Sequence, residues 1–363
     1  MSDDAFPVLG IDHVEFWTGN AKQSAYFYTR AMGFREIAFS GLETGVRDRT
    51  TRVLQQGKIR FAISGALGPS SPVAAHVARH GDGVRDVALR VPDAEEAYRV
   101  ALERGAIDVH PPQVFEDEHG KVVRAAIGTY GETIHSLIQR DDYSGPFLPG
   151  FAAVADDRSE GGLKIIDHIV GNVEIGTMNV WADYYAQVMG FQNLVHFRDD
   201  QISTEYTALM SKVMWDGSGR VKFPINEPAE GKKRSQIDEY LDFYAGPGVQ
   251  HLALLTNDIV ATVTELRDRG VEFLRVPDAY YEDVAERFSD LSEVDVEALK
   301  RLAILADRDE EGYLLQIFSK PVMDRPTVFF EVIERHGSRG FGLGNFKALF
   351  EAIEREQALR GTL

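Results

Sequence analysis

An internal duplication is the feature that most limits the folds open to this chain of 363 residues. Residues 11–34 match residues 166–191, and both segments run from Ile-Asp-His to Met-Gly-Phe. Residues 83–106 ("GVRDVALRVPDAEEAYRVALERGA") match residues 248–271 ("GVQHLALLTNDIVATVTELRDRGV") in the same way. Each of the four segments begins with an apolar strand and continues into a helix that ends at a glycine. The duplication therefore predicts four strand–helix units, two in each half of the chain.

A β-rich stretch follows each helix, so every unit is expected to hold one strand, one helix and a small meander. These stretches cover residues 51–64, 121–140, 203–225 and 303–320. The halves are joined by residues rich in Gly, Pro and Asp, which show no periodicity. We expect a first domain over residues 1–150, a linker over 151–162 and a second domain over 163–363.

The end of the chain departs from the duplication. A strand is expected around residues 327–334, followed by a glycine-rich loop and a helix from about 344 to 359. The apolar residues of this helix recur with helical spacing and predict one buried face. We expect the helix to pack on its own domain, with the glycine-rich loop as a hinge beneath a lid.

Composition excludes several classes of protein. The sequence has no run of eighteen apolar residues, and its acidic start, "MSDDAFPVLG", lacks the apolar region of a secretory signal. The absence of cysteine excludes disulfides and thiolate chemistry and suits a cytoplasmic location. A net charge of −18 disfavours nucleic acids and anionic membranes as partners. An anionic substrate would need a local cation, such as a bound metal ion.

The duplication places three histidines in strands. His13 and His168 occupy equivalent positions, whereas His251 of the second half stands where the first half has Asp86. A single histidine in a strand is more often a hydrogen-bonded core residue than a ligand. Pairing of the two units of one half would, however, bring their first strands side by side. His168 and His251 are therefore expected to converge on one cavity.

Glu331 is the candidate for a third ligand. It lies between phenylalanines in "TVFFEVIER", where a buried carboxylate would be costly without a cation beside it. Two imidazoles and one carboxylate form the facial arrangement that holds Fe(II) and leaves coordination positions open. An ion pair of Glu331 with Arg335 or Arg325 explains the pattern equally well, and the spacing leaves both interpretations open.

The first half does not repeat this set. Asp86 replaces the second histidine, and the last strand of that half, "ETIHSLIQR", has no carboxylate to match Glu331. We therefore expect the first half to be a scaffold that binds no metal.

A group of polar residues in the second half could contact a substrate if the metal site is real. Buried amides require hydrogen-bond partners, and a ligand can supply them. Simple strand alternation directs Gln250 away from the side on which His251 lies. The group consists of Ser211, Asn226, Gln236, Gln250 and Gln316.

Several long segments resemble the 4-hydroxyphenylpyruvate dioxygenase family. They include "KFPINEPA", "SQIDEYLDFYAGPGVQHLAL", "ILADRDEEGYLLQIFSKPVMDRPTVFFEVIERHG" and "GFGLGNFKALFEAIEREQ". The resemblance covers nearly the whole chain. It implies an α+β fold of two vicinal-oxygen-chelate domains built from four βαβββ modules, plus a C-terminal helix. It also implies that only the C-terminal domain binds metal.

The same resemblance implies roles for individual residues. Fe(II) would be held by His168, His251 and Glu331. The substrate would be oriented by Ser211, Asn226, Gln236, Gln250 and Gln316. Its ring would lie between Phe318 and Phe346, near Pro224, Phe329 and Phe350.

The implied reaction converts 4-hydroxyphenylpyruvate and O₂ to homogentisate and CO₂ in tyrosine catabolism. It combines oxidative decarboxylation, ring hydroxylation and side-chain migration, and needs no separate 2-oxoglutarate. The alternatives are a 4-hydroxymandelate synthase, an extradiol ring-cleaving dioxygenase and a non-catalytic binding protein of the same fold. We also expect a dimer or tetramer, because Phe27 and Tyr28 are predicted to be exposed apolar residues.

Overall fold

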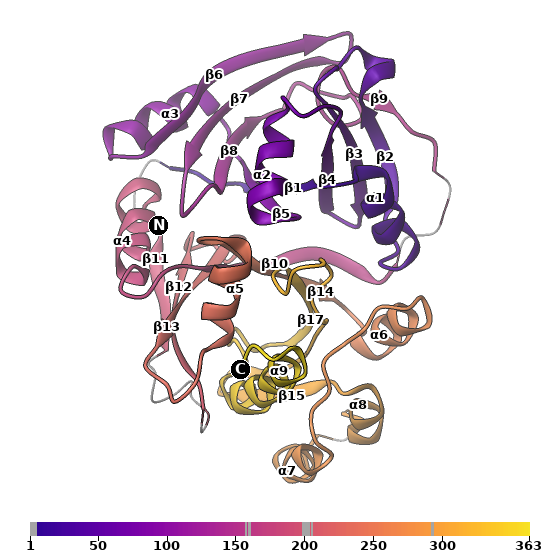
Figure 1. Cartoon of the computed structure of the whole chain (residues 1–363), viewed down its shortest axis with the longest axis vertical. Helices are drawn as coiled ribbons and strands as arrows, with labels where there is room; N and C mark the ends of the chain where they lie inside the picture. The colour runs from indigo at the N-terminus through magenta and orange to yellow at the C-terminus, as the bar shows by residue number, and fades with distance from the viewer. Residues whose placement is uncertain (1–5, 157, 159–160, 198–203, 205, 292–293) are drawn as a thin grey trace.

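The computed structural model describes residues 6–156, 158, 161–197, 204, 206–291 and 294–363. Residues 1–5 of the expected first domain, 157 and 159–160 of the expected linker, and 203 and 205 of an expected β-rich stretch lie outside the described residues. The chain forms two curled sheets, with the first half above the second in Figure 1. Each sheet is built from two βαβββ modules, as the duplication predicts.

The first sheet has nine strands within the described residues, in the order β6-β7-β8-β5-β1-β4-β3-β2-β9. The last strand, β9 (Ala152–Ala153), pairs with β2, so residues expected to form a linker extend this sheet. The first module comprises β1 (Gly10–Thr18), α1 (Ala21–Arg30), β2 (Arg35–Ser40), β3 (Arg49–Gln56) and β4 (Ile59–Ala66). The second comprises β5 (Gly83–Arg90), α3 (Ala94–Glu103), β6 (Ile107–Asp117), β7 (Gly120–Gly128) and β8 (Ile134–Gln139).

The second sheet has eight strands within the same described residues, in the order β11-β12-β13-β10-β14-β17-β16-β15. Its first module comprises β10 (Leu163–Asn172), α4 (Met178–Met189), β11 (Gln192–Phe197), β12 (Ala208–Trp215) and β13 (Lys222–Ala229). Its second comprises β14 (Gly248–Thr256), α6 (Ile259–Asp268), β15 (Leu305–Asp309), β16 (Gly312–Phe318) and β17 (Phe329–His336).

Local sequence signals set the module helices. An Asx side chain caps the start of α1, α3 and α6 by accepting a hydrogen bond from the backbone N–H three residues later. The caps are Asn20, Asp93 and Asp258. Gly190 ends α4 with a φ of 68°, a conformation that glycine adopts without strain.

Other helices connect the modules or cover the second sheet. α2 and α5 link the two modules of each half, whereas α7 and α8 are additions to the second half alone. α9, drawn in yellow in Figure 1, matches the helix expected at the end of the chain. Within the described ranges, none of the helices has the length and hydropathy needed to cross a bilayer. The bounds are Pro72–His80 for α2, Gln236–Tyr244 for α5, Ala279–Arg287 for α7, Val296–Leu302 for α8 and Phe346–Arg360 for α9. Short 3₁₀ turns span Leu42–Thr44 and Leu343–Asn345.

The central strands of both sheets carry the same pair of β-bulges. In the pairing of β10 with β14, Ile166 lies opposite Leu254 and His168 opposite Ala253, so Asp167 is an extra residue. A second shift leaves Gln250 extra on β14. Asp12 and Arg85 are the corresponding extra residues in the first sheet. A bulge changes the direction of the side chains around it, so neighbouring residues can face the same side.

The two halves share one hydrophobic core. Phe330 of β17 stacks on Phe61 of β4 at 5.9 Å between ring centroids and meets the edge of Tyr28. Tyr28 is therefore buried, with 2% of its surface exposed, and the expectation that it is exposed is wrong. Successive helical residues point about 100° apart, and on α1 it is Tyr26 that faces solvent, while Phe27 is half-buried.

Candidate metal centre and cavity

The three predicted ligands meet at the centre of the second sheet. They come from the adjacent strands β10, β14 and β17, because the first strands of the two modules pair as the duplication predicts. Oε2 of Glu331 lies 3.2 Å from Nε2 of His168 and 3.5 Å from Nε2 of His251. All three side chains are buried. The arrangement brings two imidazoles and one carboxylate to a single point.

The bulged residues fix the orientation of both imidazoles. Nδ1 of His168 donates to Oδ1 of Asp167 at 2.8 Å, and Nδ1 of His251 donates to Oε1 of Gln250 at 2.9 Å. In the neutral form of each ring, Nε2 then turns its lone pair to the centre, which is the tautomer that a metal ligand requires. Alternation placed Gln250 on the wrong side because it took no account of the bulge.

Asp167 is in turn held by two cations. Arg335 donates to both of its carboxylate oxygens at 2.8 Å, and Nζ of Lys222 lies 3.1 Å from Oδ1. Burial raises the pKa of the Asp167 carboxyl, but hydrogen bonds from His168 and Arg335 outweigh it and hold the pKa well below its usual range. Sequence reasoning missed this support, although the Ile-Asp-His triplet occurs in both halves.

The ion pairs considered as an alternative role for Glu331 are not the ones that form. Arg335 pairs with Asp167, and Arg325 donates to the backbone carbonyls of Arg79 and Phe243. The Glu331 carboxylate instead faces the two histidines.

Electrostatics keep Glu331 ionised. Burial raises its pKa, but the charge of His168 and hydrogen bonds from both histidines lower it to about 2. Burial is also the main reason that the pKa of His251 falls, whereas Glu331 and Asp167 raise the pKa of His168 against burial. A buried carboxylate beside two imidazole Nε2 atoms is suited to a divalent cation, which can replace the protons in these hydrogen bonds.

The spacing of the donor atoms also fits a metal ion. Neighbouring ligands about 2.1 Å from an octahedral ion lie about 3.0 Å apart, close to the 3.2 and 3.5 Å measured here. The donor set of two imidazoles and one carboxylate is that of Fe(II) sites with open positions. His168, His251 and Glu331 thus fit Fe(II).

A mostly apolar cavity opens beside the three ligands. The empty space in it, including the part that is open to solvent, is about 580 Å³. Nine of the predicted substrate-contacting residues line it: Ser211, Pro224, Asn226, Gln236, Gln250, Phe318, Phe329, Phe346 and Phe350. Sequence reasoning missed Val170, Phe197, Leu209, Val213, Phe341, Leu349 and Ile353, whose apolar side chains carry no signal that separates a cavity wall from a core.

Gln316 is the predicted residue that does not line this cavity. Its side chain is buried beneath the backbone of Gly342, where a Cβ would stand 2.6 Å from Oε1. Neither amide atom of Gln316 has a hydrogen-bond partner within the described part of the chain. Its part in orienting a substrate stays a prediction.

Aromatic rings of the cavity wall come from three elements, β16, β17 and α9. Phe329 stacks on His251 at 4.8 Å between centroids, and Phe318 meets the same imidazole edge-on at 6.0 Å. Phe346 comes from α9 and stacks with Phe350 at 6.0 Å. The predicted sandwich of a substrate ring between Phe318 and Phe346 would therefore join the sheet to the C-terminal helix.

Comparison with known proteins supports the same assignment. Residues 3–145 match the family described as hydroxyphenylpyruvate dioxygenase, N-terminal, and residues 165–317 match the Glyoxalase/Bleomycin resistance protein/Dioxygenase superfamily. The chain is 50% identical to 4-hydroxyphenylpyruvate dioxygenase of Yarrowia lipolytica over 98% of its length and 93% of that protein. It is 47% identical to the enzyme of the same name from Dictyostelium discoideum, over 98% of this chain and all of that protein. The chain belongs to the 4-hydroxyphenylpyruvate dioxygenase family.

A solved structure has the same fold as this family member. A mutant of 4-hydroxymandelate synthase from Streptomyces coelicolor superimposes with a TM-score of 0.88 and 34% sequence identity. The match covers 97% of this chain and 99% of the other. The two-domain vicinal-oxygen-chelate fold is thus shared with a protein named for a different product.

In this 4-hydroxyphenylpyruvate dioxygenase family member, the first half fills the equivalent centre with its own residues. The strand registers place Asp86 at the position of His251, and Ser136 at that of Glu331. Ser136 donates to both carboxylate oxygens of Asp86 through its N–H and hydroxyl groups. Arg124 contacts both residues, with Nε 3.1 Å from the Ser136 hydroxyl and Nη2 3.4 Å from Asp86. A guanidinium therefore stands beside these two positions.

Proposed function

We propose that the chain is an Fe(II)-dependent dioxygenase that converts 4-hydroxyphenylpyruvate and O₂ to homogentisate and CO₂, as a step of tyrosine catabolism. The observation that carries the proposal is the convergence of His168, His251 and Glu331 on one point at the wall of an apolar cavity. Membership of the 4-hydroxyphenylpyruvate dioxygenase family supports the substrate and the product.

The proposed iron ligands are His168, His251 and Glu331. When bound, Fe(II) supplies the O₂ activation that decarboxylation and ring hydroxylation require. Asp167 and Gln250 hold the two imidazoles with Nε2 toward the ion. The ion would also supply the positive charge that an anionic keto acid needs, because Lys222 and Arg335 are already committed to Asp167.

The remaining residues of the cavity bind and orient the substrate. Phe318 and Phe346 hold the aromatic ring from the sheet side and from α9. The apolar walls exclude water, which protects reactive species from side reactions. We assign the polar contacts to Ser211, Asn226, Gln236, Gln250 and Gln316. Pro224, Phe329 and Phe350 complete the packing around the ring.

A cytoplasmic location and a homo-oligomer belong to the same proposal. The lack of cysteine suits a reducing compartment. The burial of Tyr28 removes one argument for a dimer or tetramer, and the exposed Tyr26 on the same helix takes its place. Light scattering of the purified chain measures the oligomeric state.

Product analysis tests the reaction. The Fe(II)-loaded protein is expected to consume O₂ with 4-hydroxyphenylpyruvate and to yield homogentisate, which NMR identifies. Formation of 4-hydroxymandelate would overturn the choice of product, and absence of O₂ uptake would favour a non-catalytic binding protein.

A substitution tests the metal ligands. Glu331→Ala is expected to abolish both tight Fe(II) binding and O₂ uptake, because two neutral imidazoles alone hold Fe(II) weakly. Ser136→Ala alters the equivalent position of the first sheet and serves as the matched control, with iron affinity unchanged. Equal iron affinity of Glu331→Ala and the unaltered chain would contradict the ligand assignment.

A further inference from the structure

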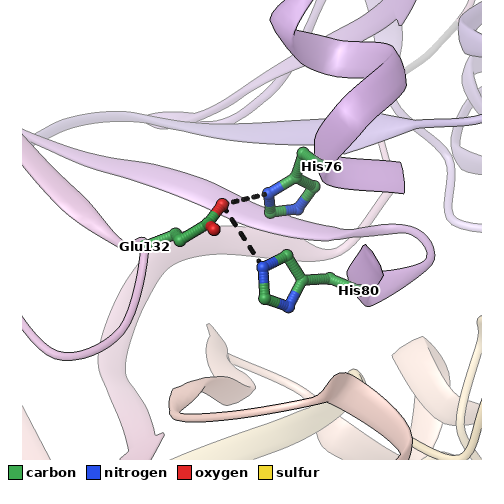
Figure 2. Close-up of side chains that lie close together, drawn as sticks. All are labelled: His76, His80 and Glu132. Carbon is green, nitrogen blue, oxygen red and sulfur yellow. Dashed lines mark ion pairs between the residues drawn. The ribbon is translucent and has the colours of Figure 1, made fainter. Parts of the chain in front are cut away.

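A second cluster of metal-binding side chains lies in the first half, outside the cavity described above. His76 and His80 are one turn apart on α2, so their side chains lie on the same face of that helix. Glu132 lies in the connection between β7 and β8. Figure 2 shows both imidazole rings beside the Glu132 carboxylate. Oε2 of Glu132 is 3.6 Å from Nδ1 of His76 and 3.3 Å from Nε2 of His80.

These separations fit a tetrahedral ion. Ligand atoms about 2.0 to 2.1 Å from tetrahedral Zn²⁺ lie about 3.3 to 3.4 Å from one another. Two histidines one turn apart on a helix, completed by a carboxylate from elsewhere in the chain, are a donor set used by zinc enzymes. The distances therefore require little movement for the three side chains to share an ion.

The hydrogen bonds of the two imidazoles also suit a metal ion. Nδ1 of His80 donates to the backbone carbonyl of Tyr244 at 2.5 Å, which leaves Nε2 with a free lone pair toward Glu132. His76 is 3% exposed, and neither of its ring nitrogens has a hydrogen-bond partner in the described ranges. A buried imidazole without a partner is costly unless something binds it.

We propose that His76, His80 and Glu132 form a second metal site, which binds a divalent ion of the Zn²⁺ type and leaves the fourth position to water. The carboxylate has room for this role, because Arg79 pairs with the other oxygen of Glu132, Oε1, at 2.9 Å. A site with three protein ligands, two of them nitrogen donors, favours Zn²⁺ over oxygen-seeking Mg²⁺ or Ca²⁺. The simpler alternative is an ion pair between Glu132 and a protonated His80, and it binds no metal.

The site lies where the two halves of the chain touch. The His80 ring stacks on Tyr244, the last residue of α5, at 4.6 Å between centroids. Arg325 reinforces this contact by donating to the carbonyls of Arg79 and Phe243. A bound ion would fix α2 to the β7–β8 connection and thereby hold the surface on which α5 rests. Zn²⁺ is therefore expected to stabilise the folded chain.

Counting bound Zn²⁺ on the full-length chain tests the proposal. The ion also suits the candidate iron centre, so the chelator-treated chain is expected to bind two Zn²⁺ ions in equilibrium dialysis with elemental analysis. His80→Gln and Glu331→Ala are each expected to bind one, and the double variant none. His119→Gln, which alters an exposed histidine beside Glu118, is the matched control and should retain two. A single ion on the unaltered chain, or two on His80→Gln, would overturn the proposal.

A second measurement covers a failure of His80→Gln to fold. Glu132 is 39% exposed, so Glu132→Gln leaves the core intact. In the Glu331→Ala background, Zn²⁺ is expected to raise the unfolding temperature, and the added Glu132→Gln change should abolish that rise. Equal rises in both variants would contradict the site and would leave the ion pair as the role of Glu132. The result does not depend on the proposed reaction, because in the Glu331→Ala background no Zn²⁺ is expected at the candidate iron centre.

Discussion

Two residues beside the metal ligands account for the geometry of the candidate iron centre. Asp167 and Gln250 are each the extra residue of a bulge, and each accepts a hydrogen bond from the histidine that follows it. A strand without bulges would direct alternate side chains to opposite faces. The bulges therefore bring a ligand and its hydrogen-bond acceptor to the same side of the sheet.

Removing the charge of Asp167 should weaken iron binding. Asp167→Asn deprives His168 of an anionic acceptor and leaves Arg335 and Lys222 without their partner. Loss of such an outer partner typically costs about 10- to 100-fold in metal affinity. Competition with a chromophoric chelator measures the affinity.

The first half supplies a control for this change. Asp12 contacts Nδ1 of His13 at 2.7 Å and lies 2.9 Å from Nε of Arg140, so it too lies between the histidine that follows it and an arginine. Asp12→Asn should leave Fe(II) affinity unchanged. Equal Fe(II) affinity of Asp167→Asn and Asp12→Asn would contradict the prediction that Asp167 supports metal binding by orienting His168.

At the scale of elements, α9 closes the cavity and is held at both ends. Before its first turn, the Tyr280 hydroxyl donates to Oδ1 of Asn345 at 2.6 Å. In its last turn, Arg360 donates to both oxygens of Glu239 on α5, at 3.1 and 2.8 Å. Phe346 lies at the first of these anchored ends, so its ring has a defined position on the cavity wall.

Truncating Phe346 should separate the two stages of the reaction. Phe346→Ala removes a wall from the substrate ring but leaves the proposed iron ligands in place. Decarboxylation should continue, while ring hydroxylation fails more often, so the O₂ consumed should exceed the homogentisate formed. An oxygen electrode combined with product chromatography measures both quantities.

The same helix offers the control. Leu359→Ala changes a residue that is 82% exposed on α9, and coupling of O₂ uptake to product should not change. Unaltered coupling in Phe346→Ala would argue against a stacking role for that ring.

The elements differ in how far the sequence predicts them. Caps such as Asp93 and Asp258, and the apolar spacing of the helices, are local signals, so the four modules and α9 follow from the sequence. α2 and α5 fall in connections that the duplication does not mark. A bulge adds one residue without disturbing an apolar pattern, so the direction of Gln250 could not be predicted.

The candidate site also has a part that the sequence predicts and a part that it does not. The convergence of His168, His251 and Glu331 was predictable, because the duplication pairs the two strands that carry the histidines and a carboxylate between phenylalanines calls for a cationic neighbour. An ion pair of Arg335 with Glu331 was one of the alternatives that the spacing left open, but Arg335 pairs with Asp167. Choosing between two carboxylates requires the strand register, which depends on contacts distant in sequence.

For the whole molecule, one buried histidine joins the halves. His135 of β8 donates from Nδ1 to the carbonyl of Val87, and its Nε2 accepts from the Tyr185 hydroxyl of α4 at 2.8 Å. Its ring also stacks on Phe223 of β13 at 5.3 Å. Burial lowers the pKa of His135, despite the opposing effects of the Val87 carbonyl and Asp86.

This burial makes stability depend on pH. Because the pKa is lower in the folded chain than its ordinary value of about 6.5, the unfolded chain takes up the proton first as the pH falls. The neutral His135 ring therefore makes its full contribution to the free energy of unfolding above a pH of about 6.5. Below that pH the contribution falls by at most about 1.4 kcal/mol per pH unit. Urea unfolding at a series of pH values should show this loss, and His135→Gln should show a shallower slope.

An exposed histidine again provides the comparison. His119→Gln removes a ring that is 46% exposed and should leave the pH dependence of unfolding unchanged. An unaltered slope in His135→Gln would mean that the interface between the halves tolerates a charged imidazole.

Arg124 makes the centre of the first sheet different from the proposed iron centre of the second, because its positive charge belongs to the chain itself. Its guanidinium stands beside the two positions that carry His251 and Glu331 in the other sheet, and it is part of the chain. A chelator cannot remove this cation, an oxidant cannot change its valence and no competing ion can displace it. The centre of the first sheet is therefore complete as synthesised, whereas the proposed iron centre of the second sheet depends on the metal supply of the cell.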